Sequence, residues 1–144
     1  MSVKLAEISK EPIDVRGLEE LVSGFENGAV ITFVGQVRNN SRGKAVQYLE
    51  YDVYVPLATK QIQKVADQAV LQWPVDVAVQ HRIGRIELGE ASIVICVGSV
   101  HREDAYHASR YLIDTIKNEV PIWKRETCPD GAFWIEGEDA IAAQ

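Results

Sequence analysis

The sequence predicts an α+β fold in which about three helices cover one face of a largely antiparallel, mixed sheet. Two observations support this prediction. Apolar residues alternate in several short segments, as in strands, and recur every three or four residues in three longer ones, as in helices. The predicted order is β-α-β-β-α-β-β-α-β-β, and its short connections and hairpins favour this class over a doubly wound parallel sheet.

Strands are predicted where β-branched and aromatic residues gather between turn residues. These segments are residues 3–8, 28–37, 46–53, 75–83, 91–100, 121–127 and 132–136. Residues 38–44 are predicted to be a polar loop and residues 84–89 a turn region. The sequence Pro129-Asp130-Gly131 predicts a hairpin between the last two strands.

Helices are predicted over residues 15–23, 57–73 and 103–118. Asp14 is a suitable N-cap for the first, Pro56 suits the first turn of the second, and Pro74 stops it. No repeat or linker divides the chain, so we expect one domain over residues 1–144. The small, acidic segment 137–144 is expected to be a flexible tail.

The composition narrows the class of protein. The formal net charge of −6 argues against non-specific nucleic-acid binding, which depends on neutralising phosphates. No apolar segment of about eighteen residues is present to span a membrane, and the first residues lack the apolar part of a secretory signal. We therefore expect a cytoplasmic protein.

Neither a metal nor a cofactor is predicted. Two cysteines and three histidines show no metal-ligand spacing, and GxGxxG, P-loop and GxSxG motifs are absent. Cys96, in an apolar run, is expected to be a small buried hydrophobe. Cys128 follows basic residues and is either an activated thiol or, as we favour, a partly buried bystander. Gly35 within a strand indicates a bulge or a close approach of backbone.

Positive charge gathers in three places against this acidic background. The clusters are Arg38, Arg42 and Lys44 in the polar loop, His101 and Arg102 before the third helix, and Lys117, Lys124 and Arg125 near the end of the chain. His101 and Arg102 either complete an anion site at a helix N-terminus or simply begin a solvated helix. The sequence leaves both interpretations open.

The third cluster has an ordinary explanation for each residue. Lys117 in the last turn of a helix complements the helix dipole, and Lys124 and Arg125 must point to opposite faces of a strand. If the clusters converge, however, a lysine crowded by other cations would lose its proton more readily and could act as a nucleophile or general base. The same crowding would attract phosphate or carboxylate.

Four segments together resemble one family. They are GAVITFVGQVRNNSRGKAV, HRIGRIELGE, SVHREDAYHASRYLID and KNEVPIWKRE. Their order and spacing resemble the large, catalytic subunit of molybdopterin synthase over nearly the whole chain, from Val3 to Glu136. The pair Lys117 and Lys124, closing on the P-x-W-K-R-E segment, is the most specific element of this resemblance.

The resemblance implies a hammerhead-type fold and a homodimer that binds one small ubiquitin-like sulfur carrier at each end, giving a heterotetramer. It also implies a sulfurtransferase activity. The carrier's C-terminal Gly-Gly thiocarboxylate would enter a basic pocket and deliver sulfur, twice, to cyclic pyranopterin monophosphate. The product would be the molybdopterin dithiolene of the molybdenum cofactor. Since sulfur arrives on the carrier, the large subunit needs no sulfur-bearing cysteine.

The resemblance also assigns residues. Lys117 would act in acid–base chemistry or a transient covalent link, and Lys124 would stabilise the anionic intermediate or the carrier terminus. The substrate phosphate and pterin would be held by Arg38, His101 and Arg102, part of the pocket coming from the second protomer. Two alternatives are a dimeric, non-catalytic module that binds anions or nucleotides, and a purely structural partner of a ubiquitin-like protein.

Overall fold

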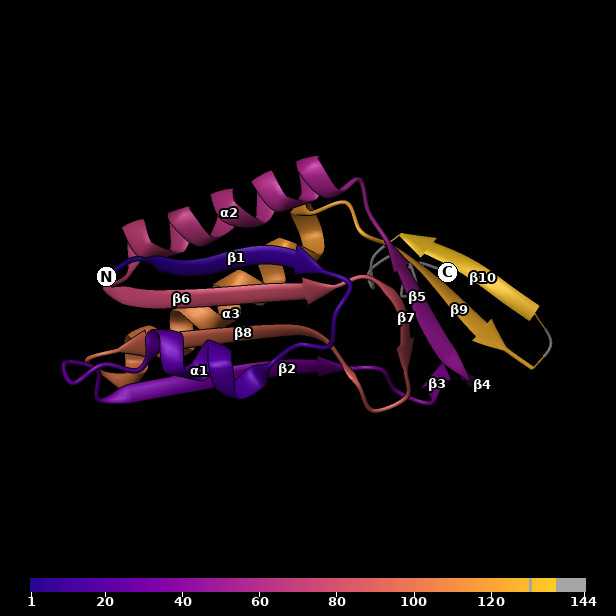
Figure 1. Cartoon of the computed structure of the whole chain (residues 1–144), viewed down its shortest axis with the longest axis horizontal. Helices are drawn as coiled ribbons and strands as arrows, with labels where there is room; N and C mark the ends of the chain where they lie inside the picture. The colour runs from indigo at the N-terminus through magenta and orange to yellow at the C-terminus, as the bar shows by residue number, and fades with distance from the viewer. Residues whose placement is uncertain (130, 137–144) are drawn as a thin grey trace.

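Residues 1–129 and 131–136 are described by the structure, a computed structural model. Asp130, in the predicted turn, and the predicted flexible tail 137–144 lie outside the described residues. The elements form two four-stranded sheets and a short two-stranded ribbon, with three helices (Figure 1). This arrangement confirms the predicted α+β class. None of the helices in the described part of the chain is long and apolar enough to cross a membrane.

The first sheet has the strand order β1-β6-β8-β2. Its strands are β1 (Val3–Ser9), β6 (Val75–Arg82), β8 (Ala91–Ser99) and β2 (Ala29–Gln36). β1 runs parallel to β6, whereas β8 runs antiparallel to both of its neighbours. The central strands β6 and β8 carry buried residues on both faces, so both faces of this sheet are covered.

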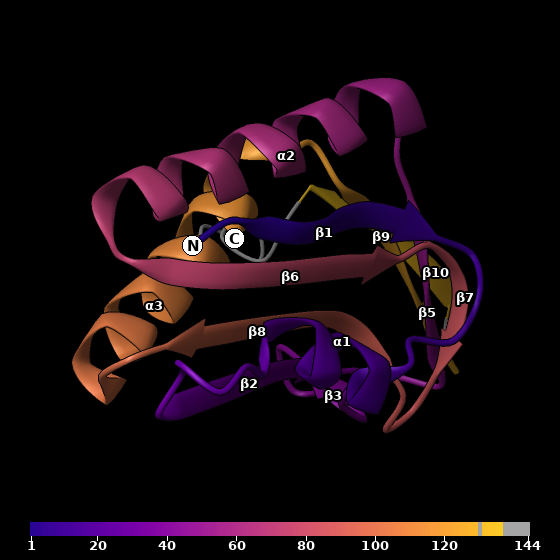
Figure 2. The ribbon, with the colours of Figure 1, turned by 60° about the vertical axis from the view of Figure 1, so that its left-hand side comes forward.

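Helices α2 (Val55–Gln72) and α3 (Arg102–Glu119) cover one face, and the shorter α1 (Val15–Val22) covers the other (Figures 1 and 2). The prediction that the helices share one face was therefore wrong. The reason lies in the central strands, because Ala78, Val94 and Cys96 turn their side chains away from α2 and α3. These residues are buried beneath α1, which packs Leu18 and Val22 onto them.

The second sheet has the order β10-β9-β5-β7, and all its pairs are antiparallel. Its strands are β10 (Gly131–Glu136), β9 (Trp123–Cys128), β5 (Tyr48–Asp52) and β7 (Gly84–Glu87). This sheet crosses the end of the first sheet at which β6 stops (Figure 1). The predicted hairpin is confirmed by the pairing of β9 with β10, whereas the single predicted sheet is in fact two.

Two segments predicted to be irregular contain short strands. The turn region 84–89 includes β7, which begins at Gly84 with φ +85° and therefore takes the chain from one sheet into the other within a residue or two. The polar loop 38–44 includes β3 (Asn40–Ser41), which pairs with β4 (Lys44–Ala45). Both elements are too short for a periodic pattern to reveal them.

Candidate active site

A cavity of about 270 Å³ lies where the two sheets meet the C-terminal end of α3. Its apolar lining comprises Phe33, Leu49, Ile93, Ile113, Ile116, Val120 and Ile122. Its charged and titratable lining comprises Arg38, Tyr51, His81, Lys117, Lys124 and Glu126. Mostly apolar walls with a few convergent polar groups are typical of a small-molecule site.

The α3 wall of the cavity follows from helical spacing. Ile113, Ile116, Lys117 and Val120 lie three, four and seven residues from the first of them, which places them on one side of the helix and its exit. The isoleucines are buried, and Lys117 is exposed at the mouth. The lysine that complements the helix dipole therefore also lines the cavity.

The β9 wall follows from strand alternation. Lys124 and Glu126 are both only 5% exposed and face the cavity, opposite Tyr51 and Leu49 of β5. Arg125, between them, lies directly opposite Glu50 on the other face and is half-buried. The prediction that Lys124 and Arg125 point to opposite faces is confirmed.

The third wall comes from the end of β2 and the loop after it. The register with β8 shifts between Gly35 and Gln36, and a Cβ at Gly35 would lie 2.8 Å from Cγ2 of Ile93. Both the bulge and the close approach predicted at Gly35 are therefore present. They bring Arg38, which is exposed, to the cavity beside residues of β8.

His81 was missed as a site residue by the sequence analysis. It ends the row Val75, Val77, Val79 and His81, which alternates along β6 toward α2 and α3 and is buried throughout. Burial, despite a hydrogen bond to the Arg82 carbonyl and with a contribution from the Lys117 charge, lowers the pKa of His81 from 6.5 to about 4. The sequence did contain one indication of this residue, since His81 is the polar last member of an alternating row of valines.

His101 and Arg102 lie elsewhere in this protomer. His101 is the N-cap of α3 without a side-chain cap hydrogen bond, and Arg102 is its first residue; both are exposed. Sixteen residues of helix separate His101 from Lys117, which is roughly 24 Å at 1.5 Å per residue. Three of the five predicted residues (Arg38, Lys117 and Lys124) thus share the cavity, and two lie at the far end of the helix.

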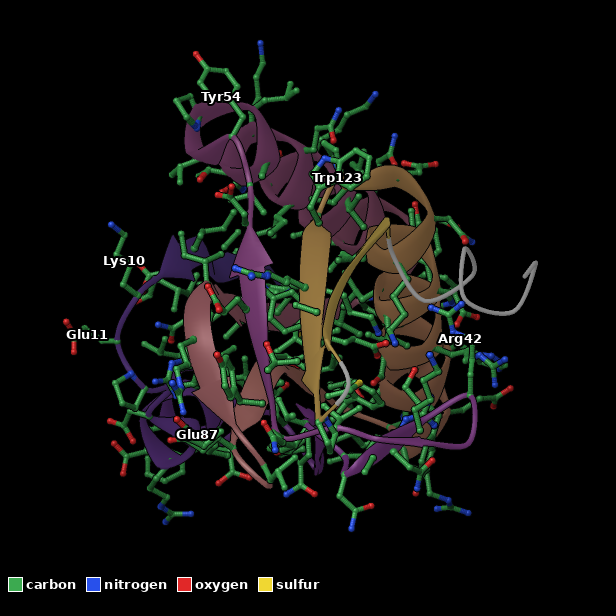
Figure 3. All side chains as sticks on the ribbon, turned by 90° about the vertical axis from the view of Figure 1, so that its right-hand side faces the viewer. Lys10, Glu11, Arg42, Tyr54, Glu87 and Trp123 are labelled. Carbon is green, nitrogen blue, oxygen red and sulfur yellow. The ribbon has the colours of Figure 1, made fainter. Side chains whose placement is uncertain are left out.

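The remaining predicted candidates do not line the cavity. Figure 3 shows Arg42 projecting from the β3–β4 ribbon, and Lys44 lies in the same ribbon. Cys128 is buried in the small apolar cluster around Leu49 and Ile86, as is typical of a structural thiol. Within residues 1–129 and 131–136, no group of three or more His, Cys, Asp or Glu residues is arranged to hold a metal ion.

This arrangement suits an anionic ligand. Among the described residues, three cations and one carboxylate, Glu126, line the cavity, while the imidazole of His81 adds no charge at neutral pH. Amines beside apolar walls can stabilise an oxyanion or attack a carbonyl carbon, because the low local dielectric strengthens each electrostatic contact. Acyl transfer chemistry on a small anionic group is therefore within the reach of these side chains.

Known proteins are similar to this chain in both sequence and fold. The family model described as MoaE protein matches residues 8–119. The molybdopterin synthase catalytic subunit of Staphylococcus carnosus is 41% identical over 92% of this chain and 89% of its own length. That of Halalkalibacterium halodurans is 40% identical over 94% of this chain and 87% of its own.

A solved structure extends the similarity to the fold. The crystal structure of molybdopterin synthase from Staphylococcus aureus superposes with a TM-score of 0.85 at 40% sequence identity. The match covers 89% of this chain and 94% of that one.

Proposed function

Since the chain belongs to the MoaE protein family of molybdopterin synthase catalytic subunits, we propose that its cavity transfers sulfur from a thiocarboxylated carrier protein to cyclic pyranopterin monophosphate. The observation that supports this most directly is the convergence of Lys117, Lys124 and Arg38 on one cavity. Two successive transfers would build the dithiolene of molybdopterin. The protein is accordingly a sulfurtransferase, and we propose that it works in the cytoplasm.

The two lysines take different parts in this proposal. Lys117, exposed at the mouth on a flexible side chain, is placed to meet the carrier's terminal thiocarboxylate and to act in proton transfer or a transient amide link. Lys124, buried and fixed in a strand, is suited to stabilising the negative charge that develops when the thiocarboxylate carbon is attacked.

Arg38 offers the forked donor that binds phosphate well and lies on the loop at the edge of the cavity. We assign it to the phosphate of the pterin substrate. His101 and Arg102 are too far along α3 to reach the same ligand within one protomer. We propose that the protein is a homodimer in which these two residues complete the cavity of the partner protomer.

The partner protein follows from the substrate. A thiocarboxylate at the end of a Gly-Gly tail is small and anionic, and the cavity of about 270 Å³ is lined by the cations Arg38, Lys117 and Lys124. We therefore propose a small ubiquitin-like sulfur carrier as the second subunit, one at each end of the dimer, giving a heterotetramer.

Turnover tests this function. Purified protein is mixed with thiocarboxylated carrier and cyclic pyranopterin monophosphate, and molybdopterin is followed as its fluorescent oxidation product. Lys117→Ala is expected to reduce turnover by at least about 100-fold, the effect typical of losing an acid–base group, while carrier binding persists. Lys60→Ala, which removes an exposed lysine of α2 away from the cavity, is the matched control.

Absence of product from the wild-type protein, with carrier and substrate shown to be competent with another synthase, would contradict the enzymatic function. A folded Lys117→Ala protein that still turns over as fast as the Lys60→Ala control would contradict the role of Lys117. A wild-type protein that yields no product, together with a Lys117→Ala protein that only binds anions more weakly, would favour the alternative of a non-catalytic binding module.

A further inference from the structure

We propose that His81 is a positioning residue of this cavity, whose Nε2 accepts a hydrogen bond from the Lys117 ammonium group and so orients that lysine toward the bound ligands. This inference rests on the proposed function and adds a residue to it. It is drawn from the ring's fixed tautomer, its place in the cavity wall and the charges around it.

The tautomer of His81 is set by one contact. Nδ1 lies 2.8 Å from the carbonyl oxygen of Arg82, and because a carbonyl can only accept, Nδ1 must carry the proton. The opposite nitrogen, Nε2, is then an acceptor whenever the ring is neutral.

The ring itself is held firmly. His81 pairs with Ile8 of β1 and Ile93 of β8 in the first sheet, and it is only 5% exposed. Tyr51 of β5 meets the ring edge to face, with centroids 5.1 Å apart. The accepting carbonyl is equally fixed, since Arg82 pairs with Ser9 in β1. An acceptor on such a rigid mount can orient a flexible partner.

Lys117 is that partner. Its charge contributes to lowering the pKa of His81, and both side chains line the same cavity. A lysine side chain loses considerable rotamer freedom when it is held in one geometry, so an acceptor fixed in advance lowers the entropic cost of placing the amine.

A neutral acceptor has a specific advantage here. A carboxylate in the place of His81 would cancel part of the positive charge that the anionic substrate and carrier tail require. The imidazole accepts a hydrogen bond without adding a negative charge, and its pKa of about 4 means that it does not take a proton from an ammonium group at neutral pH. His81 thus orients the lysine and leaves its protonation to the reaction.

Two substitutions separate this role from a structural one. Asparagine can reproduce the Nδ1 donor to the Arg82 carbonyl but places no acceptor at the position of Nε2. Glutamine reaches the position of Nε2 with its carbonyl oxygen but loses the contact with Arg82. We expect His81→Asn to reduce kcat by about 100-fold, the cost of misplacing a reacting group, with little change in KM. His81→Gln should retain at least about ten times more turnover than His81→Asn.

Equal turnover in His81→Asn and the wild type would overturn the inference, as would a His81→Gln protein no more active than His81→Asn. A measurement that does not depend on turnover accompanies the kinetics. In ¹⁵N NMR spectra of the imidazoles at neutral pH, Lys117→Ala should shift the Nε2 resonance of His81 and leave Nδ1 protonated.

An Nε2 resonance unchanged by Lys117→Ala would also overturn the inference. Failure of the proposed function would look different, because the wild type would then yield no product while the NMR contact between His81 and Lys117 could still be observed.

Discussion

The two ends of α3 carry similar charges in very different surroundings. At the C-terminal end, Lys117 stands at the mouth of a cavity walled by both sheets. At the N-terminal end, His101 and Arg102 are exposed, and Glu103 and Asp104 of the first turn complement the helix dipole. Basic residues alone therefore do not make a site; within one protomer, enclosure by other elements distinguishes the two ends.

The exposed end acquires a function in our proposal only through a second protomer. Mixed dimers test that difference between the ends most strongly. Lys117→Ala and Arg102→Ala homodimers should each be nearly inactive, because every site lacks one residue. If each site takes Lys117 from one protomer and Arg102 from the other, a mixed dimer holds one fully intact site and one doubly altered site.

Randomly mixed protomers should therefore recover roughly one quarter of the wild-type rate, since about half of the dimers carry one intact site of two. Mixing Lys117→Ala with Lys124→Ala is the matched control, because both lysines line the cavity of one chain and no intact site can form. Mixed dimers that are verified by mass but remain inactive with Arg102→Ala would show that the two ends of α3 do not share a site.

A smaller effect, on stability, should distinguish the buried His81 from the exposed His101. His81 is buried with its pKa lowered to about 4, so the folded protein resists a proton that the unfolded chain binds below about pH 6.5. Above pH 6.5 the imidazole is neutral in both the folded and the unfolded protein, so His81 does not lower the stability. Below pH 6.5 the unfolded chain binds the proton first, and the free energy of unfolding falls as the pH approaches 4. By pH 4 the free energy of unfolding should have dropped by about 3 kcal/mol from this group.

Urea unfolding at pH 7 and pH 4 measures this drop, and His81→Gln should remove it. The other titratable residues that line the cavity with His81, among them Tyr51, Lys117, Lys124 and Glu126, are common to both proteins, so their contributions cancel in the difference. His101→Gln at the exposed end of α3 should retain the full wild-type dependence. The same acid-induced loss in the wild type and in His81→Gln would refute the burial argument.

The parts of the fold that could be predicted from sequence are those in which a periodic pattern repeats over many residues. The three helices and the long strands were found because their patterns run over many residues, and the opposite faces of Lys124 and Arg125 followed from strand alternation alone. The strand β7 escaped prediction because its four residues contain a single buried side chain, Ile86. Placement of α1 on the second face required knowing which strands are central.

The site was predictable only in part for a related reason. Arg38, Lys117 and Lys124 were candidates because they are basic, but their convergence depends on a second sheet crossing the end of the first. His81 was passed over because its neighbours in the chain, Arg82 and Gly84, indicate a turn, whereas its partners are in other elements. Tertiary contacts between distant segments leave no local pattern.

The smallest effect on turnover and stability is expected for Arg125, on the face of β9 that does not line the cavity. Arg125 lies between Lys124 and Glu126 but faces away from the cavity, with its guanidinium 4.0 Å from a carboxylate oxygen of Glu50 and 42% of its side chain exposed. An exposed ion pair of this kind contributes less than about 1 kcal/mol. Arg125→Ala should therefore lower the free energy of unfolding by no more than that and leave turnover near the wild-type rate.

Lys124→Ala, one residue away, should reduce turnover by about 100-fold or more, because it removes the positive charge that our proposal assigns to stabilising the negative charge of the reaction. Kinetics and urea unfolding of the two variants side by side make the comparison. A large loss of turnover in Arg125→Ala would mean that the reaction depends on the net positive charge of β9, whichever face of the strand carries it. Loss confined to Lys124→Ala would show that the face of the strand decides which of two adjacent cations takes part.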